Sequence, residues 1–101
     1  MVEVTWTPFA LDDLQSIYDY IAQDSPTYAS RYIDKLVDRV DILIEHPEAG
    51  RIVPEFEDES IRELIEGSYR IIYKIKSIDE IGMLRIHHSA RVSSIKKCNK
   101  S

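Results

Sequence analysis

The strongest constraint on the fold is a helix-start signal that occurs twice. Thr7-Pro8 and Ser25-Pro26 each combine a hydroxyl group that can cap a helix with a proline, which suits the first helical position. Apolar residues recur at spacings of three and four after each signal, as far as Pro47, which cannot continue a helix. The pattern predicts helices over residues 8–23 and 26–46, joined by about two residues into a helical hairpin.

Period-two alternation of apolar and polar residues predicts strands on both sides of this hairpin. The expected strands are residues 2–6, 61–66, 69–77 and 83–89. Gly67-Ser68 has the form of a two-residue hairpin turn, with glycine at the position that requires a positive φ. Residues 47–60 contain two prolines, a glycine and an acidic run, and we expect them to form a loop that is the most mobile part of the chain.

The order of these elements is β-α-α-β-β-β, which predicts an α+β fold. The apolar sides of the helical hairpin should cover one face of a small, mostly antiparallel sheet, which the first strand joins by a long crossover. Tyr69 and Tyr73 alternate in phase with apolar neighbours and should pack in the core. We expect a single domain over residues 1–101, with residues 92–101 as a polar basic tail.

The phase of the strands also predicts what the uncovered sheet face carries. In the last strand, Leu84 and Ile86 should share one face with His88, whereas Arg85 and His87 should share the other. The uncovered face would then be basic, with Arg70, Lys74, Lys76, Arg85 and His87.

Charge is distributed unevenly along the chain, whose net charge is −5. Residues 1–68 hold 5 Lys and Arg against 16 Asp and Glu, a net of −11, whereas residues 69–101 hold 8 against 2, a net of +6. The acidic body argues against a general nucleic-acid binder, and the basic segment suits a polyanionic or acidic partner. A solvated strand and tail would explain the same asymmetry equally well.

Several functional classes have no support in the sequence. Cys98 is the only cysteine, so the chain offers neither an internal disulfide nor a multi-cysteine metal site, and no His, Asp and Glu set has metal-ligand spacing. No phosphate-binding glycine loop or nucleophile elbow is present. We therefore expect no metal and no cofactor. A signal peptide and a membrane span are also missing, which leads us to expect a cytoplasmic protein without membrane contact.

The candidate functional side chains are arginines and histidines near the three C-terminal strands. Arg62, Arg70, Arg85 and Arg91 lie on these strands or just beyond them, and hairpin geometry should bring at least some of them together near one sheet face. Clustered guanidinium groups bind phosphates or carboxylates and can stabilise a developing phosphorane charge. His87 would join them by phase as a general acid or base, whereas His88 points the other way. Arginines that keep an exposed face soluble and structural histidines are the alternative interpretations.

Several segments, each weak alone, follow one another in a fixed order along the chain. They are Val4-Thr5-Trp6-Thr7-Pro8 with Ala10 and Asp13-Leu14; Ile17-Tyr18-Asp19-Tyr20-Ile21-Ala22; Leu43-Ile44-Glu45-His46-Pro47-Glu48-Ala49-Gly50-Arg51; Ile61-Arg62-Glu63-Leu64; Tyr69-Arg70-Ile71-Ile72-Tyr73; and Ile86-His87-His88-Ser89-Ala90-Arg91. In the order and spacing of these segments the chain, from Trp6 to Arg91, resembles the RelE/ParE toxins of type II toxin–antitoxin systems.

The resemblance implies a protein that blocks growth when free and is held inactive by a cognate antitoxin. The antitoxin would wrap the toxin with extended and helical segments, in a heterotetramer or larger complex, and DNA would be contacted only through the antitoxin. RelE-like members cut messenger RNA within the ribosome, whereas ParE-like members inhibit DNA gyrase without known hydrolysis.

Two features favour the ParE-like branch. Lys35 is the single lysine among the first 68 residues, whose net charge is −11. Their negative electrostatic field disfavours an approach to ribosomal RNA. The segment His88-Ser89-Ala90-Arg91 also resembles the ParE pattern of histidine, small residues and arginine. For an RNase the catalytic candidates are Arg62, Arg70, His87 and Arg91. For contact with the target or antitoxin they are Arg70, Arg85, Arg91, Lys96 and Lys97. A non-toxic interaction module is the third possibility.

Overall fold

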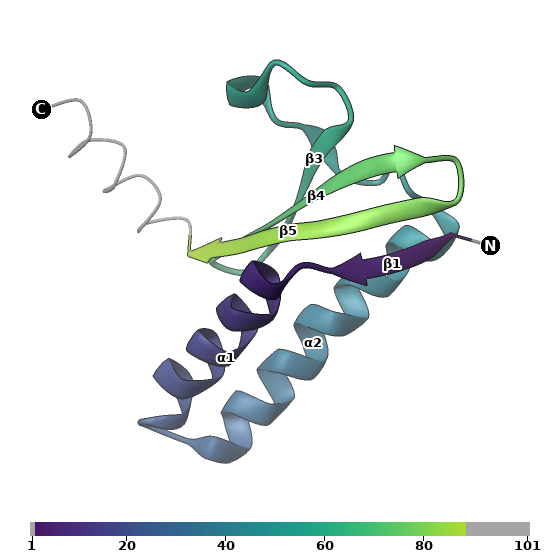
Figure 1. The fold of residues 1–101 in the computed structure, drawn as a ribbon. Helices are drawn as coiled ribbons and strands as arrows, with labels where there is room; N and C mark the ends of the chain where they lie inside the picture. The colour runs from purple at the N-terminus through teal and green to yellow at the C-terminus, as the bar shows by residue number, and fades with distance from the viewer. Residues whose placement is uncertain (1, 89–101) are drawn as a thin grey trace, which may run out of the picture.

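The computed structural model describes residues 2–88 as two helices packed on a five-stranded sheet (Figure 1). The helices are α1 (Pro8–Ala22) and α2 (Pro26–Glu45). The strands are β1 (Glu3–Trp6), β2 (Arg51–Ile52), β3 (Ile61–Glu66), β4 (Tyr69–Ser77) and β5 (Glu80–His88), and a short 3-10 helix, η1 (Pro54–Phe56), lies between β2 and β3. The strand order is β1-β5-β4-β3-β2, in which only the β1–β5 pairing is parallel. This confirms the predicted α+β class.

The predicted helix starts are confirmed by their capping hydrogen bonds. The Thr7 hydroxyl accepts from the Ala10 N–H at 3.1 Å, and the Ser25 hydroxyl accepts from the Tyr28 N–H at 3.1 Å. Each proline occupies the first turn, and α2 ends immediately before His46-Pro47. The two helices form an antiparallel hairpin below the sheet, with α1 against β5 and α2 against β1 (Figure 1).

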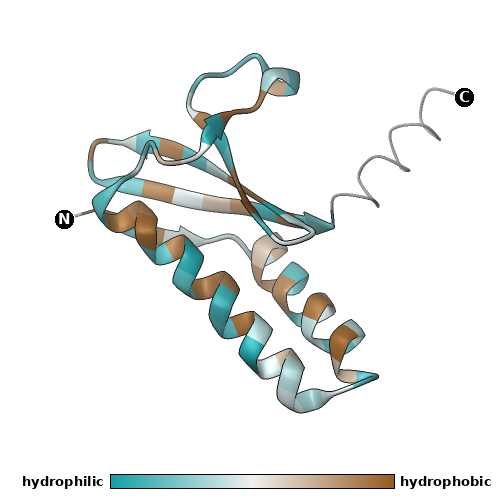
Figure 2. Ribbon diagram, turned by 180° about the vertical axis from the view of Figure 1, so that it is seen from behind, coloured by the Kyte–Doolittle hydropathy of each residue, from teal (hydrophilic) through white to brown (hydrophobic). Residues whose placement is uncertain are grey.

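The core lies between the helical hairpin and one sheet face. Apolar residues recur along both helices and in alternating bands along the strands (Figure 2). Tyr69 and Tyr73 are 5% and 0% exposed, which confirms that both belong to the core. Their partners there include Leu36, Val40, Leu43, Leu64, Ile71, Ile81, Met83 and Ile86.

The hairpin turn between β3 and β4 also follows the prediction. Glu66 pairs with Tyr69, so the turn contains two residues, and Gly67 has a φ of 59°. This register determines which side chains meet across the sheet, because directly paired residues share a face.

Two expectations about the sheet were wrong. Residues 47–60 are not simply a loop, since β2 pairs with β3 as a fifth strand and η1 follows it. A two-residue strand is too short to show alternation, so the sequence pattern could not reveal it. The part of this segment that contains η1 lies on the side of the sheet away from the helices (Figure 1).

The second correction concerns the phase of β5. The strand begins at Glu80 rather than Met83, and its register against β4 shifts between Ile72 and Tyr73, which leaves Leu84 without a partner. Such a bulge reverses the alternation. Met83 is therefore in the core, while Leu84 is only partly buried.

Candidate functional site

Arg70 and His87 lie directly opposite each other on the sheet face away from the helices. These two candidates are therefore brought together as the sequence predicted. The Arg70 side chain is only 16% exposed. Its Nε donates to Glu63 Oε1 at 2.6 Å, and its second terminal nitrogen lies 3.9 Å from Glu55 Oε2. Two carboxylates thus balance the charge of the arginine.

Glu63 organises this site, although the sequence analysis did not single it out. It is the buried charged residue within residues 2–88, at 1% exposure. Both carboxylate oxygens are used, one by Arg70 and the other by the Nε of Arg51. A buried carboxylate needs such partners, because burial of an unpaired charge costs several kcal/mol. Its diagonal position from Arg70 across the β3–β4 hairpin was the available signal, since the Gly67-Ser68 turn determines that register.

The other cations of this face also have acidic neighbours. Lys74 Nζ lies 3.8 Å from Asp58, and Lys76 Nζ lies 3.9 Å from Glu80. Asp58 also accepts hydrogen bonds from the Ser60 hydroxyl and N–H, at 2.6 and 2.9 Å, and these bonds lower the pKa of the Asp58 carboxyl. The predicted basic face is therefore largely neutralised within the chain.

Arg85 does not join Arg70, contrary to the expected grouping. It forms a bidentate pair with Asp13 of α1, at 2.9 and 3.0 Å, and its guanidinium lies 5.7 Å from the centre of the Phe9 ring. Hydrogen bonds to Asp13 raise the pKa of Arg85. The Ile86 N–H also donates to Asp13 at 2.8 Å, so this carboxylate attaches α1 to β5.

Arg62 is separated from Arg70 as well, because it pairs with Tyr73 and therefore faces the helices. One of its terminal nitrogens donates to the Gly50 and Glu48 carbonyls, at 3.1 and 3.4 Å, and its Nε is buried without a hydrogen-bond partner. The Tyr73 hydroxyl donates to the Pro47 carbonyl at 2.8 Å and accepts from the Gly50 N–H at 2.9 Å. Burial raises the pKa of Tyr73. Arg62 and Tyr73 together hold the turn after α2 in place.

His88 has the structural environment that the alternative interpretation proposed. Its ring contacts Tyr69 edge-on at 5.1 Å, and Tyr69 in turn contacts Tyr32 at 5.7 Å. Burial, and then the charge of Glu66, raise the pKa of Tyr32. Arg91, Lys96 and Lys97, with the rest of the basic tail, lie outside the described residues.

Comparison with known proteins identifies the family. The model of the family described as "ParE toxin of type II toxin-antitoxin system, parDE" matches residues 4–93. This chain belongs to that family. It is therefore the toxin component of a type II toxin–antitoxin system, within the RelE/ParE superfamily.

Two curated relatives are also toxins by name, and one of them carries a RelE name. Over 92 residues the toxin is 37% identical to Toxin RelE2 of Caulobacter vibrioides, covering 91% of this chain and all of the relative. It is 30% identical over 86 residues to Putative toxin Y4kP of Sinorhizobium fredii, covering 85% of this chain and 86% of the relative.

Solved structures agree with the fold. A chain of the chromosomal ParDE toxin–antitoxin system from P. aeruginosa is 30% identical, with a TM-score of 0.72, over 87% of this toxin and 96% of that chain. A chain of the RelBE2 toxin–antitoxin complex from Mycobacterium tuberculosis is 21% identical, with a TM-score of 0.65, over 86% and 96% of the two chains. The second likeness concerns the fold alone.

Within residues 2–88, the Arg70 guanidinium is already paired with acidic side chains of the toxin itself. A phosphate approaching Arg70 would have to compete with Glu63 and Glu55. In this part of the chain no three His, Cys, Asp or Glu side chains are placed to hold a metal ion. None of its helices is long and apolar enough to cross a membrane.

Proposed function

We propose that this toxin arrests growth by inhibiting DNA gyrase and that a cognate antitoxin neutralises it. The observation that carries the proposal is the state of the Arg70–His87 pair. A nuclease site needs guanidinium groups free to bind the scissile phosphate, whereas Glu63 and Glu55 already neutralise Arg70. Arg62 and Arg85 point elsewhere and serve the turn after α2 and the α1–β5 contact.

Long-range electrostatics supports the same choice. Residues 1–68 carry a net charge of −11, and the cations on the uncovered sheet face are paired with acids inside the chain. An acidic surface repels the ribosomal RNA that a ribosome-dependent nuclease must approach. A protein target such as gyrase imposes no such requirement.

The relatives support an antitoxin partner, since both solved neighbours come from toxin–antitoxin systems. We place the target contact in the basic segment with Arg91, Lys96 and Lys97. Arg70 and Arg85 are paired with carboxylates of the toxin itself, so they would contribute to an interface only if carboxylates of the partner replaced these. Contact with DNA would occur through the antitoxin, and the proposed action requires no cofactor.

A RelE-like activity is the second candidate, favoured by the 37% identity to Toxin RelE2. In that case Arg70, His87 and Arg91 remain the catalytic candidates, because Arg62 faces the helices. An antitoxin segment or the ribosome would then have to displace Glu55 from Arg70.

Two assays run in parallel with the purified toxin separate these functions. We expect loss of DNA supercoiling by gyrase and intact messenger RNA in a ribosome-containing translation mixture. A triple variant, Arg91→Ala, Lys96→Ala and Lys97→Ala, should restore supercoiling, whereas Asp34→Asn should remain inhibitory. Messenger-RNA cleavage that requires ribosomes, with supercoiling unaffected, would replace the gyrase proposal with the nuclease. Normal growth on induction and inactivity in both assays would reject both.

A further inference from the structure

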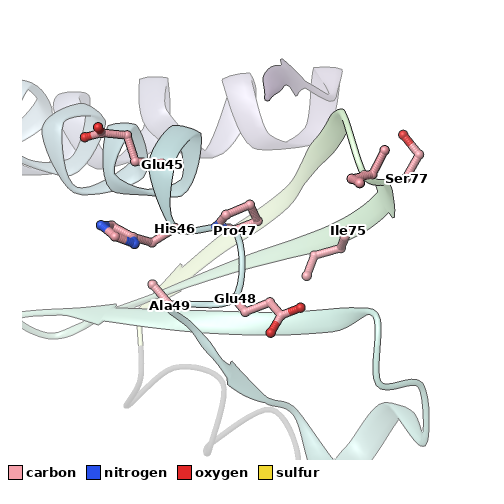
Figure 3. Close-up of a pocket in the computed structure, with 8 residues that line it drawn as sticks. Glu45, His46, Pro47, Glu48, Ala49, Ile75 and Ser77 are labelled. Carbon is pink, nitrogen blue, oxygen red and sulfur yellow. The ribbon is translucent and has the colours of Figure 1, made fainter. Parts of the chain in front are cut away.

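A pocket of about 510 Å³ lies between the end of α2 with the residues that follow it and the β4–β5 turn (Figure 3). None of the residues that line it belongs to the Arg70 site, and it has no part in the proposed function. The residues that line it are Glu45, His46, Pro47, Glu48, Ala49, Ile75, Ser77 and Ile78. Figure 3 shows the side chains of Glu48 and Ile75 pointing toward each other, so a charged and an apolar wall meet here.

The apolar side of the pocket is open to solvent. Ile75 is partly buried against the core, whereas Ile78 in the adjoining turn is 88% exposed, more than any other large apolar side chain of residues 2–88. Pro47 and Ala49 extend the same surface. An aliphatic side chain placed on it would remove this apolar area from water, at roughly 25 cal/mol per Å².

The polar side of the pocket carries two carboxylates, and no Lys or Arg is among the residues that line it. Within residues 2–88, Glu45 and Glu48 make neither an ion pair nor a side-chain hydrogen bond, unlike Glu63, Glu66 and Asp58. The last turn of α2 contains no basic residue, although the negative end of the helix dipole favours a cation there. The carboxylates and the helix dipole therefore both favour the binding of a cation.

The lip of the pocket is held in place from behind. Tyr73 bridges the Pro47 carbonyl and the Gly50 N–H, and Arg62 donates to the Glu48 and Gly50 carbonyls. Gly50 is required at this position, because an added Cβ would lie 2.6 Å from the Glu63 carbonyl and 2.7 Å from the Tyr73 hydroxyl. Such bracing lowers the entropy lost when a ligand binds.

We propose that this pocket docks a protein partner through an extended segment in which a Lys or Arg stands beside a branched aliphatic residue. The aliphatic side chain would lie on Ile75 and Ile78, and the cation would lie beside the Glu48 carboxylate, with the charge of Glu45 and the C-terminal end of α2 adding to the negative potential. Its charge preference is opposite to that of the basic sheet face. The inference does not depend on whether gyrase or the ribosome is the target.

The test uses the intact toxin labelled with nitrogen-15 and the peptide acetyl-Ala-Ile-Arg-Ile-Ala-amide as probe. We expect amide shifts confined to residues 45–49 and 75–78, and an affinity roughly tenfold weaker in the Glu45→Gln, Glu48→Gln double variant. The matched control, Asp34→Asn with Asp38→Asn, removes the same charge from exposed positions of α2 and should bind as the unmodified toxin does.

Three further probes can overturn the proposal. A peptide with Glu in place of Arg, and one with Ala in place of both Ile residues, should each leave the pocket amides unshifted. Equal binding of either peptide would contradict the combined recognition of a cation and an aliphatic group. Spermidine that binds the same amides as tightly as the peptide would show a site for free polycations instead. Scattered shifts, or equal weakening in the control variant, would show that the pocket is not the docking surface.

Discussion

The two faces of the sheet are stabilised in different ways. On the face toward the helices, Leu64, Ile71 and Tyr73 pack against apolar residues of α1 and α2. On the other face, the buried Glu63 holds Arg51 and Arg70. One face therefore depends mainly on apolar burial, which varies little with the identity of each neighbour, whereas the other depends on specific charge pairs. Variants of single polar groups can test this difference.

The largest effect should follow from Glu63→Gln, which removes the buried charge while keeping the side-chain shape. Arg70, at 16% exposure, would retain only Glu55 at 3.9 Å. Breaking a buried ion pair costs about 3–5 kcal/mol, and we expect the lower end of this range because Arg51 is 71% exposed. Urea unfolding measured at neutral pH gives the change in unfolding free energy.

The control for this prediction replaces both partners. Glu63→Leu combined with Arg70→Met leaves no unpaired charge, so its loss should be well below the sum of the two single losses. Additive losses, or a loss under about 1 kcal/mol for Glu63→Gln, would show that the uncovered face does not depend on this pair.

An intermediate effect is expected for Tyr73→Phe, which removes a hydroxyl group from the buried side chain of Tyr73 on the helix-covered face. The substitution leaves the Gly50 N–H and the Pro47 carbonyl without their partner, at a cost of about 1–3 kcal/mol. Thermal or urea unfolding compared with the unmodified toxin measures it. If Tyr73→Phe lowered the free energy of unfolding as much as Glu63→Gln does, the two faces of the sheet would depend equally on single polar groups.

The same variant should also change the alkaline limit of stability. Because burial raises the pKa of Tyr73 in the folded toxin, the neutral phenol stabilises the fold below the unfolded value of about 10. That contribution is lost as the pH rises through the folded pKa. Tyr73→Phe should therefore lose less stability between pH 8 and 11 than the unmodified toxin. Part of the loss remains, since burial also raises the pKa of Tyr32.

The same contrast between the faces explains what the sequence could predict. Helix starts at Thr7-Pro8 and Ser25-Pro26, the Gly67-Ser68 turn and the core tyrosines depend on local chemistry and periodicity, so they were predicted correctly. Arg70 and His87 were paired correctly because the strands beside them are regular. These features require no knowledge of distant contacts.

The partners of the arginines could not be predicted in the same way. Asp13 reaches Arg85 only because α1 begins beside the β5 bulge, and Arg51 reaches Glu63 only because residues 51–52 form an edge strand. Neither a bulge nor a two-residue strand produces a periodic pattern of apolar and polar residues in the sequence. The sequence therefore indicated the arginines and histidines of the site but not the carboxylates that neutralise the arginines.

The smallest effect should come from Asp58→Asn, at the exposed edge of the charge-paired face. The Ser60 hydroxyl and N–H donate to the carboxylate and lower its pKa, so folding favours the ionised form. The resulting stability is present above the unfolded pKa of about 3.9 and is lost as the pH falls through the lower folded value. Because Asp58 and Lys74 are both accessible to water, the loss of stability in Asp58→Asn should be smaller than in Tyr73→Phe.

The difference in urea midpoint between the unmodified toxin and the Asp58→Asn variant should be present at pH 7 and shrink toward pH 3, whereas Glu59→Gln in the same segment should show no such trend. A difference that grows on acidification would mean that the acidic segment stabilises the uncovered face by something other than its charge.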